Sequence, residues 1–203
     1  MITLALGFLA CTGPQPGYDG TNMTNYFPID GARESSFRND DTSIEWTLAM
    51  KTVQPVETID GRRVVTYELT NDDTGEVLGA VKWSASDDVL IHAWRSGTDE
   101  WTEFDTPVVF AEESMNLDET VETTTNGSTF TATRHEIATC DVVYGDSFDN
   151  CIRVTLDDGD GDDAAGPIFA GEYWLAGTYG VARMTTTGWS QAWSLSDHEY
   201  SAE

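Results

Sequence analysis

Basic residues are scarce in this sequence: 10 Lys and Arg stand against 36 Asp and Glu in 203 residues, a formal net charge of −26. Proteins that bind nucleic acid place Lys and Arg on phosphates and release the counterions held there. The charge balance therefore excludes nucleic acid as a partner. It also favours a monomer, because copies that carry the same large charge repel one another.

Long apolar runs are also missing, and no stretch reaches the roughly 18 apolar residues that a transmembrane helix needs. The main apolar run, residues 1–10, ends at Cys11. A short apolar segment that ends in small residues is typical of a secretory signal peptide. Phe8-Leu9-Ala10-Cys11 resembles the lipobox of bacterial lipoproteins, in which the chain is cut before a cysteine that carries a lipid.

We therefore expect a lipoprotein signal peptide over residues 1–10, lipidation of Cys11 and a flexible, turn-rich tether over residues 11–25. Thr12, in place of an Asp after the cysteine, favours the outer membrane of a bacterial cell envelope. The chain would then have the membrane as a partner through its lipid anchor. The alternative makes residues 3–9 a first β-strand and Cys11 a buried thiol; the polar composition directly after Cys11 favours export.

The rest of the chain favours β-strands. Apolar residues alternate with a period of two, and Asp60-Gly61 and Asn126-Gly127 are hairpin turn signals between such segments. The pattern predicts about ten strands, over residues 53–59, 62–69, 77–84, 89–95, 100–104, 119–125, 128–139, 152–156, 172–176, 181–187 and 189–195. Residues 109–117 are the one segment in which we expect a helical turn or two. Successive hairpins predict an all-β antiparallel meander in a single domain over residues 26–203, as a curved sheet, half-barrel or open sandwich.

Two short phrases carry a family resemblance. Tyr26-Phe27-Pro28-Ile29-Asp30-Gly31 resembles the "YFPL…G" opening of uncharacterised bacterial envelope lipoproteins. Residues 173–182, Tyr-Trp-Leu-Ala-Gly-Thr-Tyr-Gly-Val-Ala, resemble their closing phrase "YWYAPGVGLV", without its Pro. The strand phrase at Gly145–Val154 is similar to theirs as well. The resemblance implies a β-rich envelope protein of unassigned activity, comparable by fold-level analogy alone with curved-sheet lipoprotein carriers.

If Cys11 carries a lipid, Cys140 and Cys151 remain as an even pair in an oxidising compartment. With Gly145-Asp146 as a two-residue turn, Cys140 lies directly opposite Cys151 in a hairpin, within the distance that a disulfide bridges. We predict this disulfide. A redox-active pair or a metal site is the alternative, but the close C-x-x-C spacing of such sites is absent.

Residues 157–163 form an acidic run in which Asp158, Asp160 and Asp162 alternate as in a calcium-binding loop. Phe169 stands where such a loop needs a bidentate Glu, and paired acids recur in other predicted turns. A solvated acidic loop is therefore the favoured interpretation, weak calcium binding is the minority one, and we expect no cofactor.

Recognisable catalytic motifs are missing. His92, His135 and His198 lie outside H-E-x-x-H, and the sequence contains no G-x-S-x-G. These absences favour a non-enzymatic protein with a binding or structural role. The alternative is a surface-exposed hydrolase that uses a carboxylate or a histidine brought into place by the fold.

Aromatic residues are plentiful and lie mostly in predicted strands. Trp174, Trp189 and Trp193 are the candidates for a ligand-facing set. The simpler interpretation is that they fill the core, which is where such large side chains usually lie. The functional one is an aromatic-lined hollow for an apolar or carbohydrate ligand.

Overall fold

The computed structural model describes residues 23–29, 32–113, 115–141, 147–159, 169–186 and 192–201. The expected signal peptide, Cys11 and most of the expected tether lie outside these residues. The described elements are, in chain order, α1 (Met23–Tyr26), β1 (Ala32–Asn39), β2 (Thr47–Ile59), β3 (Arg62–Asn71), β4 (Glu76–Ala85), β5 (Asp88–Ser96), β6 (Thr102–Glu112), β7 (Thr120–Thr125), β8 (Ser128–Cys140), β9 (Phe148–Asp157), β10 (Gly171–Ala176), β11 (Gly180–Thr186) and β12 (Trp193–Ser201).

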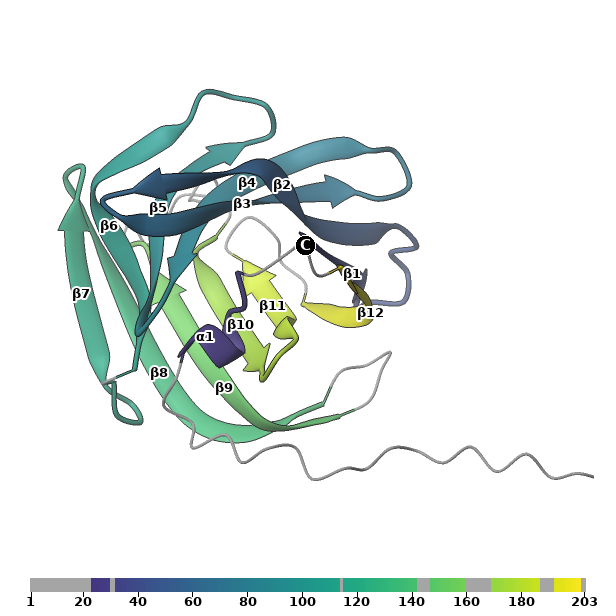
Figure 1. The fold of residues 1–203 in the computed structure, drawn as a ribbon. Helices are drawn as coiled ribbons and strands as arrows, with labels where there is room; N and C mark the ends of the chain where they lie inside the picture. Colours follow the sequence, from purple (N-terminus) through teal and green to yellow (C-terminus); the bar gives the residue numbers. More distant parts are fainter. Residues whose placement is uncertain are drawn as a thin grey trace, which may run out of the picture.

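All twelve strands belong to one antiparallel sheet with the order β6-β5-β4-β3-β2-β1-β12-β11-β10-β9-β8-β7. The sheet curls until it is nearly closed, so the strands surround an apolar interior (Figure 1). It consists of two six-stranded meanders, β1–β6 and β7–β12, joined where β1 pairs with β12. The predicted all-β antiparallel fold is confirmed, with twelve strands instead of about ten.

Two of the predicted hairpin turns have the backbone that their sequences favour. Asp60 and Gly61 have φ angles of 50° and 79°, and Asn126 and Gly127 have φ angles of 50° and 85°. Two consecutive residues with positive φ define a type I′ turn, whose twist matches that of the strands on either side. The β2–β3 and β7–β8 hairpins are therefore set by local sequence.

The sequence patterns miss some strands and misassign one segment. The expectation of a helical turn over residues 109–117 is wrong, because residues 109–112 continue β6 and pair with β5. Val108 and Phe110 are fully buried in the core, so packing against the sheet decides the structure of this apolar segment. The patterns also give no sign of β1, in which Phe37 is the only large apolar residue.

The two edges of the sheet, β6 and β7, meet at a junction that we call the seam. Here side chains of the β7–β8 hairpin take the place of ladder hydrogen bonds. The contacts are Asp105 N to Asn126 Oδ1 at 3.1 Å, Thr106 N to Thr125 Oγ1 at 3.1 Å, Val109 N to Thr123 Oγ1 at 3.1 Å, and Asn126 Nδ2 to Glu103 O at 2.7 Å. Edge strands usually leave such N–H groups exposed for pairing with other chains. The seam satisfies them internally.

The predicted disulfide between Cys140 and Cys151 is confirmed, with the two Cα atoms 5.7 Å apart. The predicted register is wrong: Cys151 pairs with Ala138, and Cys140 pairs with Phe148. Irregularities in β8 shift the pairing there, so the cysteines are diagonal neighbours instead of directly opposed ones. The predicted turn at residues 145–146 lies outside the described residues. The disulfide is buried in a small cluster of its own, separate from the main core.

Candidate ligand-binding site

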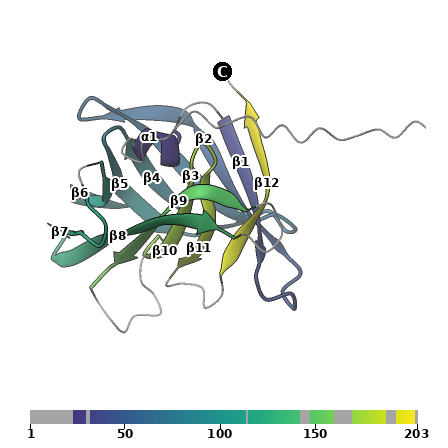
Figure 2. The same cartoon turned by 90° about the horizontal axis from the view of Figure 1, so that it is seen from below.

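The segment before β1 enters the interior of the barrel. In α1 and the residues that follow it, Met23, Tyr26 and Phe27 are buried among the core residues. Figure 1 shows α1 inside the outline of the strands, and Figure 2, turned by 90°, places it towards one end of the barrel. Residues 23–25, which belong to the segment expected to be a tether, are therefore part of the packed barrel.

Phe27 packs against three aromatic rings of the barrel wall. Its ring centroid lies 4.7 Å from that of Trp83, 5.8 Å from that of Tyr67 and 6.2 Å from that of Phe110. Aromatic pairs at these separations attract one another beyond the gain from buried area. Only 3% of Phe27 is exposed. We call residues Met23–Pro28 the plug, because they occupy space that the wall of the barrel encloses.

The plug is fixed to the wall next to Phe27. Tyr67 Oη donates a hydrogen bond of 2.9 Å to the carbonyl oxygen of Pro28. Burial raises the pKa of Tyr67 to about 12, so the hydroxyl keeps its proton and remains a donor. On the other side Gly180 has a φ of 85°, and a Cβ there would lie 3.5 Å from Pro28 Cδ. That distance is an ordinary van der Waals contact, so the positive φ, and not a lack of space next to Pro28, favours glycine at this turn.

A small apolar pocket lies next to Phe27 inside the barrel. Little of this space is wide enough for a water molecule, so the cavity is a set of narrow gaps between side chains. The hydroxyl of Tyr173 donates a hydrogen bond to the carbonyl oxygen of Phe169. The lining residues come from the plug, several strands of the wall and the approach to β10: Phe27, Met50, Tyr67, Leu69, Val81, Trp83, Phe169, Tyr173, Val181 and Met184.

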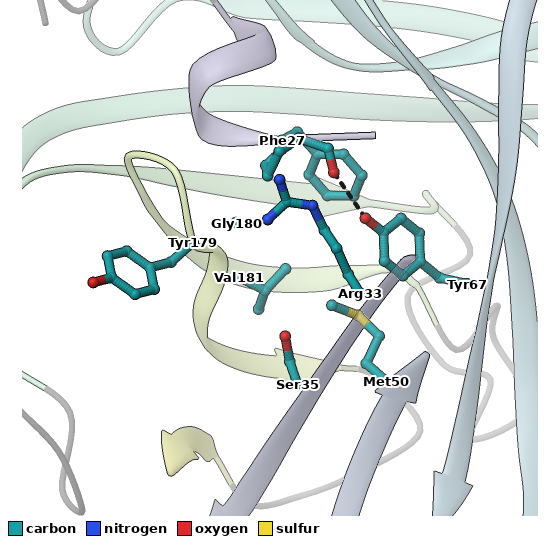
Figure 3. Close-up of a pocket in the computed structure, with 9 residues that line it drawn as sticks. Phe27, Arg33, Ser35, Met50, Tyr67, Tyr179, Gly180 and Val181 are labelled. Atoms are coloured by element: carbon teal, nitrogen blue, oxygen red, sulfur yellow. Dashed lines mark hydrogen bonds between the residues drawn. The ribbon is translucent and has the colours of Figure 1, made fainter. Parts of the chain in front are cut away.

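A second small pocket, which also borders Phe27 and includes the partly exposed Arg33 and Tyr179, forms the mouth of the site. Phe27, Met50, Tyr67 and Val181 line both cavities, so the mouth and the interior are adjacent across these side chains. The mouth adds polar residues, and Figure 3 shows the Arg33 side chain rising from β1 towards Phe27 and Gly180. In the same view Tyr179 points away from the mouth.

Ser35 lies on the same face of β1 as Arg33 and contacts a histidine. Its Oγ is 2.8 Å from Nδ1 of His198 on β12, the strand that pairs with β1. Burial lowers the pKa of His198, and the charge of Arg33 lowers it further, against a smaller opposing effect of Asp197. His198 is therefore neutral near pH 7, when one of its ring nitrogens can accept a hydrogen bond.

The other two histidines lie away from both cavities. His92 is buried, and its Nε2 is 2.8 Å from Ser84 Oγ. His135 contacts Thr155 through Nε2, and its Nδ1 lies 3.4 Å from a carboxylate oxygen of Asp118, a largely exposed residue. Among the described residues no carboxylate makes a hydrogen bond to His92. Neither histidine therefore lies next to a nucleophile, a carboxylate and a cavity at the same time.

Two of the three tryptophans singled out from the sequence, Trp174 and Trp193, do not line the two cavities. Trp174 packs near the disulfide, with the Arg153 guanidinium 5.5 Å from its ring centroid. Trp193 is buried in the core, 4.4 Å from the ring centroid of Trp46. Trp189 lies outside the described residues. The aromatic lining comes instead from Phe27, Tyr67, Trp83, Phe169 and Tyr173.

The predicted calcium residues are only partly described. Asp158 follows β9, whereas Asp160 and Asp162 lie outside the described residues. Within the part of the chain that the structure describes, His, Cys, Asp and Glu form no group of three that could hold a metal ion. Calcium binding by the acidic loop stays a prediction.

Sequence reasoning missed Arg33, Tyr67 and the role of Phe27. The opening phrase that contains Phe27 was visible in the sequence, but nothing in it says that the phrase folds into the barrel. Arg33 and Ser35 occur in a polar stretch without a strand pattern, so no local signal marks them.

Compared with known protein families, with characterised proteins and with solved structures, the chain matches none. Within the described residues, no helix has the length and apolar character needed to cross a membrane. Function is therefore inferred from the sequence and from the geometry of the barrel interior.

Proposed function

We propose that this chain is a lipid-anchored protein of the bacterial envelope, without enzymatic activity, whose barrel holds an apolar ligand. The observation that supports ligand binding is the position of Phe27, a side chain from outside the sheet that fills an aromatic-lined interior. The support for the anchor is the lipobox-like sequence at Cys11 and the export-type disulfide.

The plug is suited to exchange with a ligand. Residues 23–29 belong to no strand of the sheet, so ladder hydrogen bonds do not hold them as they hold β1. The hydrogen bond from Tyr67 to Pro28 is worth about 1 kcal/mol. When Phe27 leaves, a ligand that fills the space of its ring would restore most of the apolar packing in the interior. A ligand would therefore offset part of the cost of moving Phe27.

Binding is tested with the full-length protein and the neutral apolar dye N-phenyl-1-naphthylamine. We expect its fluorescence to rise on binding and purified protein to carry an apolar molecule in native mass spectrometry. Val181 lines both cavities, so Val181→Phe fills them and weakens dye binding about tenfold or more. Leu117→Phe adds an aromatic ring at a residue that is 54% exposed and serves as the matched control. No dye binding by the wild type, or equal binding by Val181→Phe, would overturn the proposal.

The anchor is tested separately. Cells that express the chain are fed an alkyne-tagged fatty acid, and label on the protein is compared between the wild type and Cys11→Ala. We expect label on the wild type only, in the membrane fraction. Equal labelling of the two proteins, or none on either, would contradict lipidation at Cys11.

Ester hydrolysis is a second candidate, favoured by the contact between Ser35 and His198 at the mouth of an apolar cavity. A hydroxyl next to a neutral histidine is the first requirement of a serine nucleophile. Working dyads also need a group that orients the histidine, and within the described residues no carboxylate is hydrogen-bonded to the His198 ring. Turnover of p-nitrophenyl butyrate that Ser35→Ala abolishes would favour the hydrolase; turnover at the rate of buffer favours the binding protein.

A further inference from the structure

We propose that the ligand is a single-chain amphiphile with an anionic head group, such as a long-chain carboxylate. Its chain would take the place of Phe27 in the interior, and its head group would lie against Arg33 at the mouth. This inference depends on the proposed binding function and adds the chemical class of the ligand.

The order of side chains along β1 matches such an amphiphile. Arg33, Ser35 and Phe37 alternate with residues of the other face, so all three lie on the face that is turned to the interior. Arg33 and Ser35 line the mouth, whereas Phe37 is fully buried in the core. One strand therefore presents a cation, a hydroxyl and a ring from the mouth inwards. An amphiphile with an anionic head would place its charge next to the cation at the mouth and its apolar chain next to the ring in the interior.

Arg33 is held in place at the mouth by two hydrogen bonds. Its Nη1 donates one of 3.2 Å to the carbonyl oxygen of Thr178, in the turn before β11. The backbone of Arg33 is tied to Thr52 Oγ1, at 2.9 Å from its N–H. A guanidinium carries five N–H donors in a planar fork that matches a carboxylate or phosphate. The side chain is thus positioned before a ligand arrives.

The mouth also differs in charge from the rest of the protein. The chain has 36 acidic residues, but none of the described residues that line the two cavities is Asp or Glu. The charge of Arg33 opposes part of the rise that burial causes in the pKa of Tyr67, and it adds to the decrease that burial causes in the pKa of His198. The described lining of the mouth thus contains one cationic side chain, Arg33, and no carboxylate. Such a local field selects an anionic head at short range, where bulk salt screens it least.

The shape of the interior limits what the ligand's apolar part can be. Little of the interior cavity is wide enough for a water molecule. A flexible, unbranched chain can follow such gaps once Phe27 has moved, whereas a bulky ring system requires the wall to separate. Together with Arg33, the narrow interior favours a single alkyl chain.

The experiment compares four ligands with the same 12-carbon chain: dodecanoate, dodecyl phosphate, 1-dodecanol and dodecyltrimethylammonium. Each displaces N-phenyl-1-naphthylamine from the full-length protein, below its micelle concentration and in roughly 0.3 M NaCl, which screens the net negative charge. A charge-assisted hydrogen bond at the mouth predicts that dodecanoate or dodecyl phosphate binds about tenfold or more tightly than dodecanol. The stronger of the two anions identifies a carboxylate or a phosphate as the natural head group.

Arg33→Gln should weaken binding of the anions about tenfold and leave dodecanol within about twofold. Arg38→Gln is the matched control, because it removes one positive charge from the exposed face of the same strand. If dodecanol binds as tightly as dodecanoate, or if the cation binds best, the inference is overturned while the binding function stands. If neither the dye nor any of the four ligands binds the wild type, both fall. The comparison among ligands needs no variant, so misfolding of Arg33→Gln cannot leave the question open.

Discussion

Replacing Phe27 by Ala tests two things: whether the Phe27 ring packs in the interior of the barrel, and whether it occupies the space that a ligand would take. Phe27 is 3% exposed, and its ring contacts Tyr67, Trp83 and Phe110. Deletion of a buried Phe side chain usually costs about 3–5 kcal/mol, made up of the transfer energy of the ring and the cavity left behind. We expect Phe27→Ala to lower the free energy of unfolding by about 3 kcal/mol, at the lower end of this range because the plug can shift.

The measurement is urea unfolding of the wild type and Phe27→Ala, followed by tryptophan fluorescence and circular dichroism. Phe27→Leu is the control, because it keeps most of the apolar volume and should cost less than about 1.5 kcal/mol. A decrease below about 1 kcal/mol for Phe27→Ala would show that the ring is not packed inside the barrel. In that case Phe27 would no longer support ligand binding in the interior.

A ligand adds a second comparison to the same experiment. A ligand present at about 100 times its dissociation constant stabilises a folded protein by about 2.7 kcal/mol. Phe27→Ala leaves open the space that a ligand must otherwise clear, so dodecanoate should bind it more tightly than the wild type and restore most of its stability. Equal or greater stabilisation of the wild type would refute the idea that ligand and Phe27 compete for one place.

Three further predictions concern the seam, the disulfide and pH. Thr123→Val removes the acceptor for the Val109 N–H and should cost about 1–3 kcal/mol in urea unfolding, whereas Thr123→Ser, which keeps the hydroxyl, should cost less; equal costs would contradict the seam hydrogen bond. Reducing the bond between Cys140 and Cys151, or replacing both by Ser, should cost about 3 kcal/mol for a loop of sequence separation 11, and an unchanged urea midpoint would contradict this expectation. Burial lowers the pKa of His92, so the unfolded chain takes up a proton near the ordinary value of 6.5 before the folded one does. Stability should therefore fall as the pH drops below about 6.5, by at most about 1.4 kcal/mol per pH unit for this group, and the fall should be smaller in His92→Gln; parallel curves for the two proteins would refute it.

The sequence predicts those parts of the fold that depend on neighbouring residues. Asp60-Gly61 and Asn126-Gly127 define their hairpins because the residue types themselves allow positive φ. Residues 109–112 show the opposite case: an apolar run fits a helix or a strand equally well, and pairing with β5 decides between them. The disulfide could be predicted although its register could not, because irregularities in β8 shift the pairing without a local sequence signal.

The candidate site was much harder to predict than the fold. Phe27, Arg33 and Tyr67 come from the plug, β1 and β3, and only the closed sheet brings them together. Trp174 and Trp193 show why aromatic content alone is a poor guide: a strand has two faces, and one of these residues lies near the disulfide while the other is in the core. Period-two patterns give the faces of a strand but do not say which end of the barrel is open.

The order of the strands has a consequence for how the molecule can be divided. The first and last strands, β1 and β12, pair in the middle of the sheet, while the seam falls at the middle of the sequence. The connection between β6 and β7 therefore joins two consecutive meanders. Cutting there and linking β12 to β1 would give a circular permutant whose strands follow one another in simple order around the barrel. A cut at the same place without the link would give two halves that meet along β1 and β12, which makes this connection the natural position for a split reporter that reassembles around a ligand.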